Sequence, residues 1–392
     1  MAMIPQPGQK DDLGMSGSNL ASRASRRLRW EASRLSLAWN DVVYTRWHDL
    51  TRTRRLRPVP GSQPLHRKVA IYAIYPTSGV LPSHLVALRH LLAQGYAALV
   101  VANLPLSEQD LARLLPLCWQ VAQRRNFGFD IGGYRAALLW LGERLARLDR
   151  LVLTNDSIWF PVGQGRDWLA VADGLCEPGA GAAEPDLIGA VSNGGMAGSG
   201  HAGSWQIETA AADFHYCSFA LSFGPAILRD PDFLTFWRRM RLTDRKVQIV
   251  ERGEVAISRW AIGRGHRHKS CWDLQGLAER LAGQDLDRLV LLIDALIIPE
   301  DRALRERRAA FRASAAVQDK TAVVNFLLEV IALTGPAYAL PAWTVDEDGF
   351  GFLKKSPLRL DQQGRACTLA LLGPHPDFLA EAQAVPLQSL SA

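Results

Sequence analysis

The chain has 392 residues, of which 48% are hydrophobic and 21% are charged, with a formal net charge of +6; this balance is typical of a globular protein with one large core or two smaller ones. The five cysteines form no Cys-x-x-Cys pair, which argues against a zinc site or a disulfide framework and favours a reducing compartment. Neither a signal-peptide core nor an apolar run of about 18 residues is found, so we expect a cytoplasmic protein.

The N-terminal region holds most of the excess positive charge. Residues 1–20, rich in Gly, Ser and Gln, favour disorder. Residues 21–57 favour a helix in which ten arginines alternate with Trp and Leu. An interfacial helix on the inner face of the cell membrane has this composition, and a helix packed on the core with a solvated arginine face fits equally well. A proline-rich linker up to residue 64 follows.

From Lys68 onward, strand and helix patterns alternate. This alternation predicts an α/β fold with a mostly parallel sheet and right-handed connections. A loop rich in Gly, Ala and Ser over residues 194–203 is expected to be mobile. The domain limits that follow are 68–295 for the α/β domain and 296–392 for accessory helices and an irregular tail. We predict strands at 69–75, 97–102, 118–122, 150–154, 187–191, 215–223 and 288–295, and helices at 83–92, 107–115, 132–147, 233–240, 247–263, 303–315 and 321–333.

Two acids stand at the points where this alternation predicts a ligand site. Asp130 lies in a turn between glycines that opens a helix, and Asp156 ends an apolar strand. Because ligands of open α/β sheets collect beyond the carboxyl ends of the strands, both carboxylates are expected to face one crevice. Glycines near Asp130 let the backbone approach a ligand, and the helix that follows favours anions.

Asn155, Asp156 and Ser157 together offer oxygen atoms to a hard cation. Magnesium and manganese prefer carboxylate oxygens and keep positions open for phosphate. The alternative is a simple turn after the strand, since all three residue types favour turns.

The turn and the strand together resemble a known family. This part of the sequence closely resembles the rhamnan synthesis protein F family of bacterial polysaccharide glycosyltransferases. The resemblance rests on Arg125-Asn126, Gly128 and Asp130, on the helix that follows them, and on the strand that ends in Asn155-Asp156-Ser157. The same part of the sequence is more distantly similar to inverting GT-A transferases of family 2. The resemblance implies a GT-A-like, Rossmann-type sheet flanked by helices, with helical extensions at both ends. It also implies donor-binding roles for Arg125, Asn126, Gly128, Asp130, Asn155, Ser157, His266 and His268.

The resemblance also bears on the metal and the base. Asn155-Asp156-Ser157 stands where those transferases have Asp-x-Asp, which leaves Asp156 as the single carboxylate for Mg²⁺ or Mn²⁺ and leaves metal dependence open. The segment that begins at Glu251 looks like the Glu-Asp motif of those transferases, so Glu254 is assigned as the base that takes the acceptor's proton, with Glu251 in reserve. An ordinary helix start rich in acids is the alternative.

A basic cluster follows this helix. The resemblance places His266 and His268 near the donor's pyrophosphate, and a solvated basic loop is the alternative. Two other acidic triplets, Asp285-Leu286-Asp287 and Asp346-Glu347-Asp348, are set aside because neither follows a predicted strand.

The combined interpretation is a glycosyltransferase that moves rhamnose or another deoxyhexose from a nucleotide-sugar donor to a saccharide or lipid-linked acceptor of the cell surface. A subunit that binds a nucleotide sugar without catalysis is the first alternative. A nucleic-acid-binding protein ranks last, because the basic region lacks the aromatic-rich strand motifs of single-strand binders.

Overall fold

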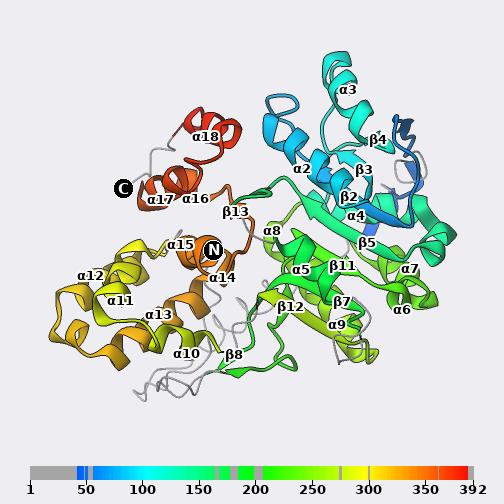
Figure 1. Cartoon of the computed structure of the whole chain (residues 1–392). Helices are drawn as coiled ribbons and strands as arrows, with labels where there is room; N and C mark the ends of the chain where they lie inside the picture. Colours follow the sequence, from blue (N-terminus) through cyan, green and yellow to red (C-terminus); the bar gives the residue numbers. More distant parts are fainter. Residues whose placement is uncertain are drawn as a thin grey trace, which may run out of the picture.

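The computed structural model describes residues 42–47, 49–51, 56–163, 167–176, 184–197, 206–272, 276–298, 301–360 and 362–386 (Figure 1). The predicted disorder of residues 1–20 and most of the predicted basic segment, residues 21–57, lie outside these ranges. None of the helices within them is long and apolar enough to cross a bilayer.

Residues 42–47 and 49–51 are helical, as predicted, and one side of this helix packs on the rest of the protein. The carboxylate of Asp49 accepts hydrogen bonds of 2.5 and 2.7 Å from the buried guanidinium of Arg135. The hydroxyl of Thr45 donates to the carbonyl of Leu242 at 3.1 Å. The apolar side chains of the same helix, Val43, Tyr44, Trp47 and Leu50, are exposed, so the structure leaves both alternatives for this segment open. Membrane contact through residues 21–57 stays a prediction.

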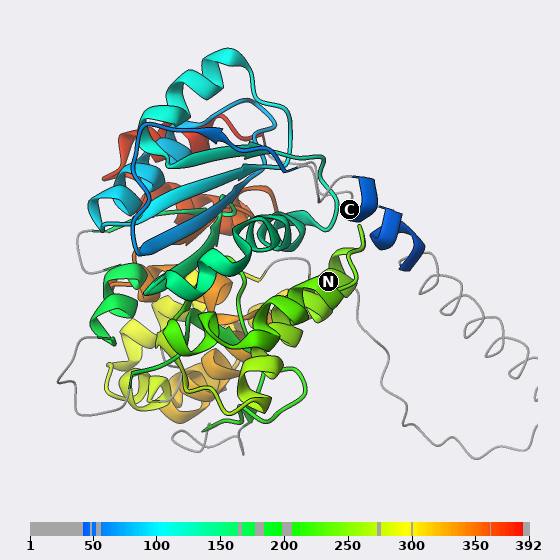
Figure 2. The same ribbon diagram turned by 90° about the vertical axis from the view of Figure 1, so that its right-hand side faces the viewer.

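The centre of the fold is a 9-stranded sheet (Figures 1 and 2). The order along its main path is β1-β4-β3-β2-β5-β11-β7-β10, and β12 pairs with β7. Strands β2 to β5 are parallel, whereas β11 lies antiparallel between β5 and β7. The predicted mostly parallel sheet flanked by helices is therefore confirmed. The strands are β1 Val59–Pro60, β2 Lys68–Ile74, β3 Ala97–Ala102, β4 Gln120–Gln123, β5 Arg150–Asn155, β6 Ile158–Trp159, β7 Leu187–Asn193, β8 Met196–Ala197, β9 Gln206–Ile207, β10 His215–Tyr216, β11 Ala220–Phe223, β12 His268–Trp272 and β13 Leu353–Lys354.

Helices cover both faces of the sheet. Successive side chains of a strand point to opposite faces: the even-numbered residues of β2 belong to the hydrophobic cluster that includes α2 and the C-terminal helices, and the odd-numbered residues belong to the cluster that includes α4, α7 and α9. The helices are α2 Pro82–Ala93, α3 Glu108–Leu114, α4 Phe129–Leu141, α5 Trp168–Gly174, α6 Pro225–Leu228, α7 Pro231–Arg239, α8 Lys246–Val250, α9 Ala256–Gly263, α10 Leu277–Ala282, α11 Leu286–Ala295, α12 Arg302–Ala313, α13 Lys320–Thr334, α14 Pro336–Ala339, α15 Pro341–Asp346, α16 Pro357–Leu360, α17 Gln362–Leu371 and α18 Pro376–Gln383.

Several predicted boundaries move by a few residues. Ser107 caps α3 as expected, since its hydroxyl accepts from the amide of Asp110 at 3.1 Å. Helix α4 begins three residues before the predicted Gly132 and ends at Leu141, after which Gly142, with a φ of +53°, forms the C-cap. The predicted strand 215–223 is divided into β10 and β11. Most of the loop predicted at 194–203 lies outside the described residues.

The strand predicted at 288–295 is wrong, because these residues belong to the helix α11. Asp285 caps this helix by accepting from the amide of Arg288 at 2.7 Å. Leu289, Leu292 and Ile293 are buried, and this i, i+3, i+4 spacing is helical. A short apolar run such as residues 288–295 fits either a strand or a helix, and here the N-terminal cap at Asp285 favours the helix.

The chain after residue 300 shares a hydrophobic core with the sheet, and α14 contacts β7. Leu304, Val324 and Leu327 belong to the same hydrophobic cluster as the even-numbered residues of β2. The segment expected to be an irregular tail contains α14 to α18, and Figure 1 shows α18 beside α2. Strand β13 pairs with β6, just after Ser157. The domain limits at 68 and 295 stay predictions.

Candidate functional site

The turn between β4 and α4 is held by the arginine that precedes the predicted motif. Arg124 donates to the carbonyl of Phe127 at 2.7 Å and to the side-chain oxygen of Asn103 at 2.5 Å. Arg125, which was predicted to bind the donor, is exposed, and Asn126 is half-buried, with a side-chain oxygen that has no hydrogen-bond partner among the described residues. Arg124 therefore shapes the turn and leaves its neighbours available to a ligand.

The backbone of this turn requires glycine at two positions. Gly128 has a φ of +78°, and Phe129 after it has a φ of +53°, a conformation that is strained for a residue with a side chain. A Cβ atom on Gly132 would lie 2.1 Å from the carbonyl oxygen of Phe127. This strained turn at the start of α4 places the Asp130 side chain against Asn155, at the end of β5.

A chain of hydrogen bonds connects Asp130 to three other elements. The side-chain amide of Asn155 donates to Asp130 at 2.5 Å, and the Asn155 oxygen accepts from the Ser157 hydroxyl at 2.5 Å. The Ser218 hydroxyl, between β10 and β11, lies 3.1 Å from Asp130 and 2.9 Å from Glu254. The structure thus joins residues of two predicted motifs at the carboxyl ends of the strands, through a serine that the sequence did not single out.

Glu254 has the electrostatics of a proton acceptor. Its side chain is 20% exposed, and burial, then the negative charge of Asp130, raise the pKa of its carboxyl group. The Ser218 hydroxyl carries one proton and cannot donate to Asp130 and Glu254 at once. A carboxyl group whose pKa is raised toward neutrality suits general base catalysis.

A π-helical turn places Glu254. Helices α8 and α9 are joined by the turn Glu251–Val255, so that one helix runs through the predicted span 247–263. Gly253 lies against α4, where a Cβ atom would be 2.7 Å from Ile131 Cγ1. Glu251, the reserve candidate, is exposed. Turns of this kind are frequent at functional sites.

Asp156 is held as a carboxylate by two donors. Its Oδ2 accepts from the amide of Tyr75 at 2.7 Å and from Nε2 of the buried His84 at 3.2 Å. The amide of Leu81 donates to Nδ1 of His84 at 3.1 Å, so the ring proton sits on Nε2 and points at Asp156. Burial raises the pKa of Asp156, but the hydrogen bond from His84, the charge of Lys355 and the hydrogen bond from the Tyr75 amide outweigh it and lower the pKa.

The negative charges of Asp130, Glu254 and Asp156 all act on the buried phenol group of Tyr134. Tyr134 of α4 donates to the carbonyl of Ser218 at 3.1 Å. Burial, then the charges of Asp130, Glu254 and Asp156, raise the pKa of Tyr134 well above its usual value. The three carboxyl groups therefore lie close enough to one another to share an electrostatic environment.

Lys354 is the functional candidate that sequence reasoning missed. Pairing of β13 with β6 brings its ammonium 3.3 Å from the Ser157 hydroxyl and 3.6 Å from the centre of the Phe219 ring. The residue is 7% exposed. No local pattern in the sequence indicates that a lysine 197 residues after Ser157 returns to it. The positive charge of Lys354 lowers the pKa of Glu254 and so opposes the larger upward effects of burial and Asp130.

The two predicted histidines lie elsewhere. His268 pairs with Leu187 at the start of β7, which is the opposite end of the strands from Asp156. His266 lies two residues before His268, the first residue of β12. Its Nε2 is 3.1 Å from Oδ2 of Asp230. The structure does not bring them to the cluster of acids, and their donor-binding role stays a prediction.

The oxygen atoms around Asp156 fit Mg²⁺ or Mn²⁺ poorly. These ions need several oxygen ligands at one point, yet Asn155 already accepts from Ser157, and one Asp156 oxygen accepts two hydrogen bonds. The Ser157 hydroxyl faces the ammonium of Lys354, which would repel a second cation. We therefore assign no chemical step to a metal at Asp156.

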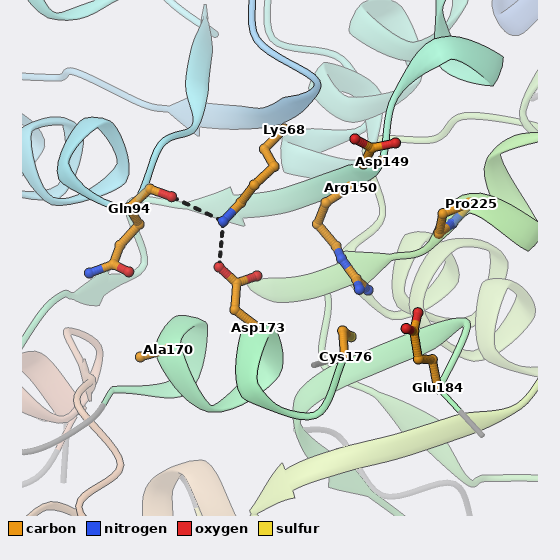
Figure 3. A pocket seen from close by; sticks show the side chains of 9 residues that line it. All are labelled: Lys68, Gln94, Asp149, Arg150, Ala170, Asp173, Cys176, Glu184 and Pro225. Carbon is orange, nitrogen blue, oxygen red and sulfur yellow. Dashed lines mark hydrogen bonds and ion pairs between the residues drawn. The ribbon is translucent and has the colours of Figure 1, made fainter. Parts of the chain in front are cut away.

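An open cavity of about 630 Å³ lies away from these acids (Figure 3). Lys68 and Arg150, at the starts of β2 and β5, line it, so it opens at the amino ends of the strands. Cys176 and Glu184 on its rim flank residues 177–183, which lie outside the described residues. We build no site on it, because the acids and Lys354 converge at the opposite end.

Known proteins similar to this chain include one from Sinorhizobium fredii and two mannosyltransferase structures. The bacterial relative, described as uncharacterized protein y4gN, is 28% identical over 199 residues, and the alignment covers 51% of this chain and about half, 47%, of the relative. Core-mannan synthase A from Aspergillus fumigatus, solved in a Mn/GDP form, is 8% identical over 54% of this chain and 74% of that one, with a TM-score of 0.32. The mannosyltransferase PcManGT from Pyrobaculum calidifontis, solved with GDP-Man and Mn²⁺, is 11% identical over 88% and 86%, with a TM-score of 0.28. These TM-scores are too low to transfer residue roles.

A family model covers the elements that carry the acids. The model for rhamnan synthesis protein F matches residues 98–334, more than half of the chain. The matched range includes the turn at Asp130, the strand end at Asp156 and the helix of Glu254. The chain therefore belongs to the rhamnan synthesis protein F family.

Proposed function

We propose that the protein is a glycosyltransferase that moves a sugar from a nucleotide diphosphate donor to a growing cell-surface polysaccharide or a lipid-linked glycan. The observation that carries the proposal is the cluster of Asp130, Ser218 and Glu254 beside Asp156 and Lys354, at the carboxyl ends of the strands. This is where ligands of open α/β sheets bind. The family description supports rhamnose or another deoxyhexose as the sugar.

In the proposed reaction, Glu254 takes the proton of the acceptor hydroxyl as its oxygen attacks the anomeric carbon. The bond from that carbon to the diphosphate breaks on the opposite side, so the anomeric configuration inverts. The diphosphate leaves with the electron pair of the broken bond. Lys354 neutralises this leaving group, a role that suits an ammonium held in place by an aromatic ring.

Asp130 and Asp156 have different parts in this proposal. Asp130 bridges Asn155 and Ser218 and so positions Glu254. Asp156 stays ionised beside His84 and accepts a hydrogen bond from a hydroxyl group of the donor. Direct contact of this carboxylate with the diphosphate is unfavourable unless a cation lies between them.

The test is a donor screen with purified protein, several nucleotide diphosphate sugars and a lipid-linked acceptor, with and without Mg²⁺ or Mn²⁺. Nucleotide release is measured. We expect release that depends on the acceptor, and a loss of at least about 100-fold in Glu254→Gln and in Asp156→Asn, which is about 2.7 kcal/mol of transition-state stabilisation. Glu251→Gln, on the same helix but exposed, is the matched control and should keep normal turnover. Near-normal turnover in both site variants would refute the assignment.

The single carboxylate of Asn155-Asp156-Ser157 favours one alternative, a subunit that binds a nucleotide sugar without transferring it. Such a protein would gain thermal stability with a donor, because ligands that bind only the folded state raise the melting temperature. It would release no nucleotide with any acceptor. The same screen, read by melting temperature and by nucleotide release, separates the two functions.

A further inference from the structure

Three side chains with metal-binding chemistry meet beside the hydrogen-bonded acids. His215 begins the short strand β10, His215–Tyr216, and Cys217 follows it directly. Nε2 of His215 lies 3.8 Å from Oε2 of Glu254. The ligand atoms of His215, Cys217 and Glu254 all lie within 4.8 Å of one another.

The histidine is already oriented as a ligand. Nδ1 of His215 lies 2.7 Å from the carbonyl oxygen of Asp213. A carbonyl oxygen only accepts, so Nδ1 carries the proton and Nε2 presents its lone pair toward Glu254. Histidines that bind metals usually donate their other ring nitrogen to such an oxygen, which fixes the tautomer.

The strand and the helix that carry these residues are joined directly. The hydroxyl of Ser258 accepts from the amide of Tyr216 at 2.9 Å and donates to the carbonyl of Glu254 at 3.0 Å. This bridge fixes the residue between His215 and Cys217 against the turn that presents Glu254. The three ligand atoms therefore need little rearrangement to converge on an ion.

Their chemistry selects one class of ion. Zn²⁺ binds Cys, His and carboxylate ligands at about 2.0–2.3 Å, and a tetrahedral site then separates the ligand atoms by about 3.3–3.8 Å. Thiolate and imidazole together disfavour Mg²⁺ and Mn²⁺, which prefer oxygen. We propose that His215, Cys217 and Glu254 form a binding site for Zn²⁺ or a similar thiophilic divalent cation, with the fourth position open.

The site would regulate transfer, a consequence that rests on the proposed function. A bound ion occupies the carboxylate of Glu254, which can then no longer take the acceptor's proton. The positive charge of Lys354, which acts on both Cys217 and Glu254, repels the ion and weakens its binding. Zinc is therefore expected to inhibit the enzyme, and a chelator to restore it.

The binding test does not depend on activity. Chelator-treated full-length protein is dialysed against Zn²⁺, and the bound metal is measured; in parallel, Co²⁺ is added and the thiolate-to-cobalt absorption is recorded. We expect one ion per chain, a cobalt–thiolate band, and at least tenfold weaker binding without the band in Cys217→Ser. Cys367→Ser, which alters a half-buried cysteine on α17, is the matched control and should bind like the wild type.

Thermal unfolding confirms that both cysteine variants are folded. Unchanged zinc affinity and an unchanged cobalt band in Cys217→Ser would overturn the site, whatever the protein transfers. In the activity arm, Zn²⁺ is expected to inhibit the wild type and Cys367→Ser but to inhibit Cys217→Ser at least tenfold less. If zinc binds as predicted but no donor is ever turned over, the metal site stands and the proposed transferase function fails.

Discussion

At the scale of single residues, Lys354 makes the sharpest prediction for the candidate site. Replacement by Met keeps the length and apolar stem that pack on Phe219 but removes the charge near Ser157. If Lys354 neutralises the leaving diphosphate, Lys354→Met should lower kcat/KM by about 10- to 100-fold, or about 1.4 to 2.7 kcal/mol. Steady-state nucleotide release measures this loss.

The control is Lys320→Met, which removes a charge from the exposed start of α13. Surface substitutions of this kind usually change stability by less than about 0.5 kcal/mol, so both kinetic constants should stay at wild-type values. Equal turnover by Lys354→Met and Lys320→Met would exclude a catalytic part for Lys354.

Residue types alone predicted part of this site. Asp130, Asn155 and Glu254 were named from their motifs, and the structure joins them through hydrogen bonds. Ser218 was not named, because a lone serine between two short strands carries no pattern. Lys354 has no local pattern either, because its neighbourhood is created by pairing of β13 with β6, a contact between distant parts of the chain.

At the scale of elements, the helix from α8 to α9 depends on Gly253. Glycine inside a helix usually costs about 1 kcal/mol relative to alanine, so alanine should stabilise this helix if nothing else intervened. Here a Cβ atom would lie 2.7 Å from Ile131, closer than side-chain carbons approach. We expect Gly253→Ala to push the turn Glu251–Val255 away from α4, to lower the free energy of unfolding by about 1–3 kcal/mol, and to reduce turnover by displacing Glu254.

Gly263, at the end of α9, is the matched control. A Cβ atom added there meets nothing within 4 Å, so Gly263→Ala should be neutral or slightly stabilising in urea unfolding and should leave nucleotide release unchanged. A Gly253→Ala protein that is as stable and as active as Gly263→Ala would show that the contact with Ile131 does not place the base.

The elements differ in how well the sequence predicts them. Strands β2, β3 and β5 are buried on both faces and appear as continuous apolar runs, which is the pattern of central parallel strands. Helix α11 has a run of similar length, and only the spacing of its buried leucines and its Asp285 cap identify it as a helix. The π-turn has no sequence signal beyond a glycine, since it arises where the helix packs on α4.

At the scale of the whole molecule, the C-terminal part is the main departure from expectation. It was expected to be accessory, but its helices complete the hydrophobic core on one face of the sheet, and its strand β13 carries Lys354 to the acids. Hydrophobic spacing identified α12 and α13. It could not show which helices they pack against, because the partner of an apolar helix face is a property of the folded chain; in the structure α13 packs on α10, α11 and α14.

A truncation after residue 300 tests this dependence. It removes the buried side chains of Leu304, Val324 and Leu327, among others, and each such side chain contributes about 1.5–3 kcal/mol when buried. Together these losses amount to a large part of the free energy of unfolding of a folded domain, which is roughly 5–15 kcal/mol. Fragment 1–300 should therefore lose its cooperative thermal transition and bind a dye for exposed apolar surface, whereas the full-length chain should keep the transition and bind little dye. A fragment 1–300 that unfolds cooperatively and still gains stability with a nucleotide sugar would show that the sheet stands alone and that a domain limit at 295 is correct.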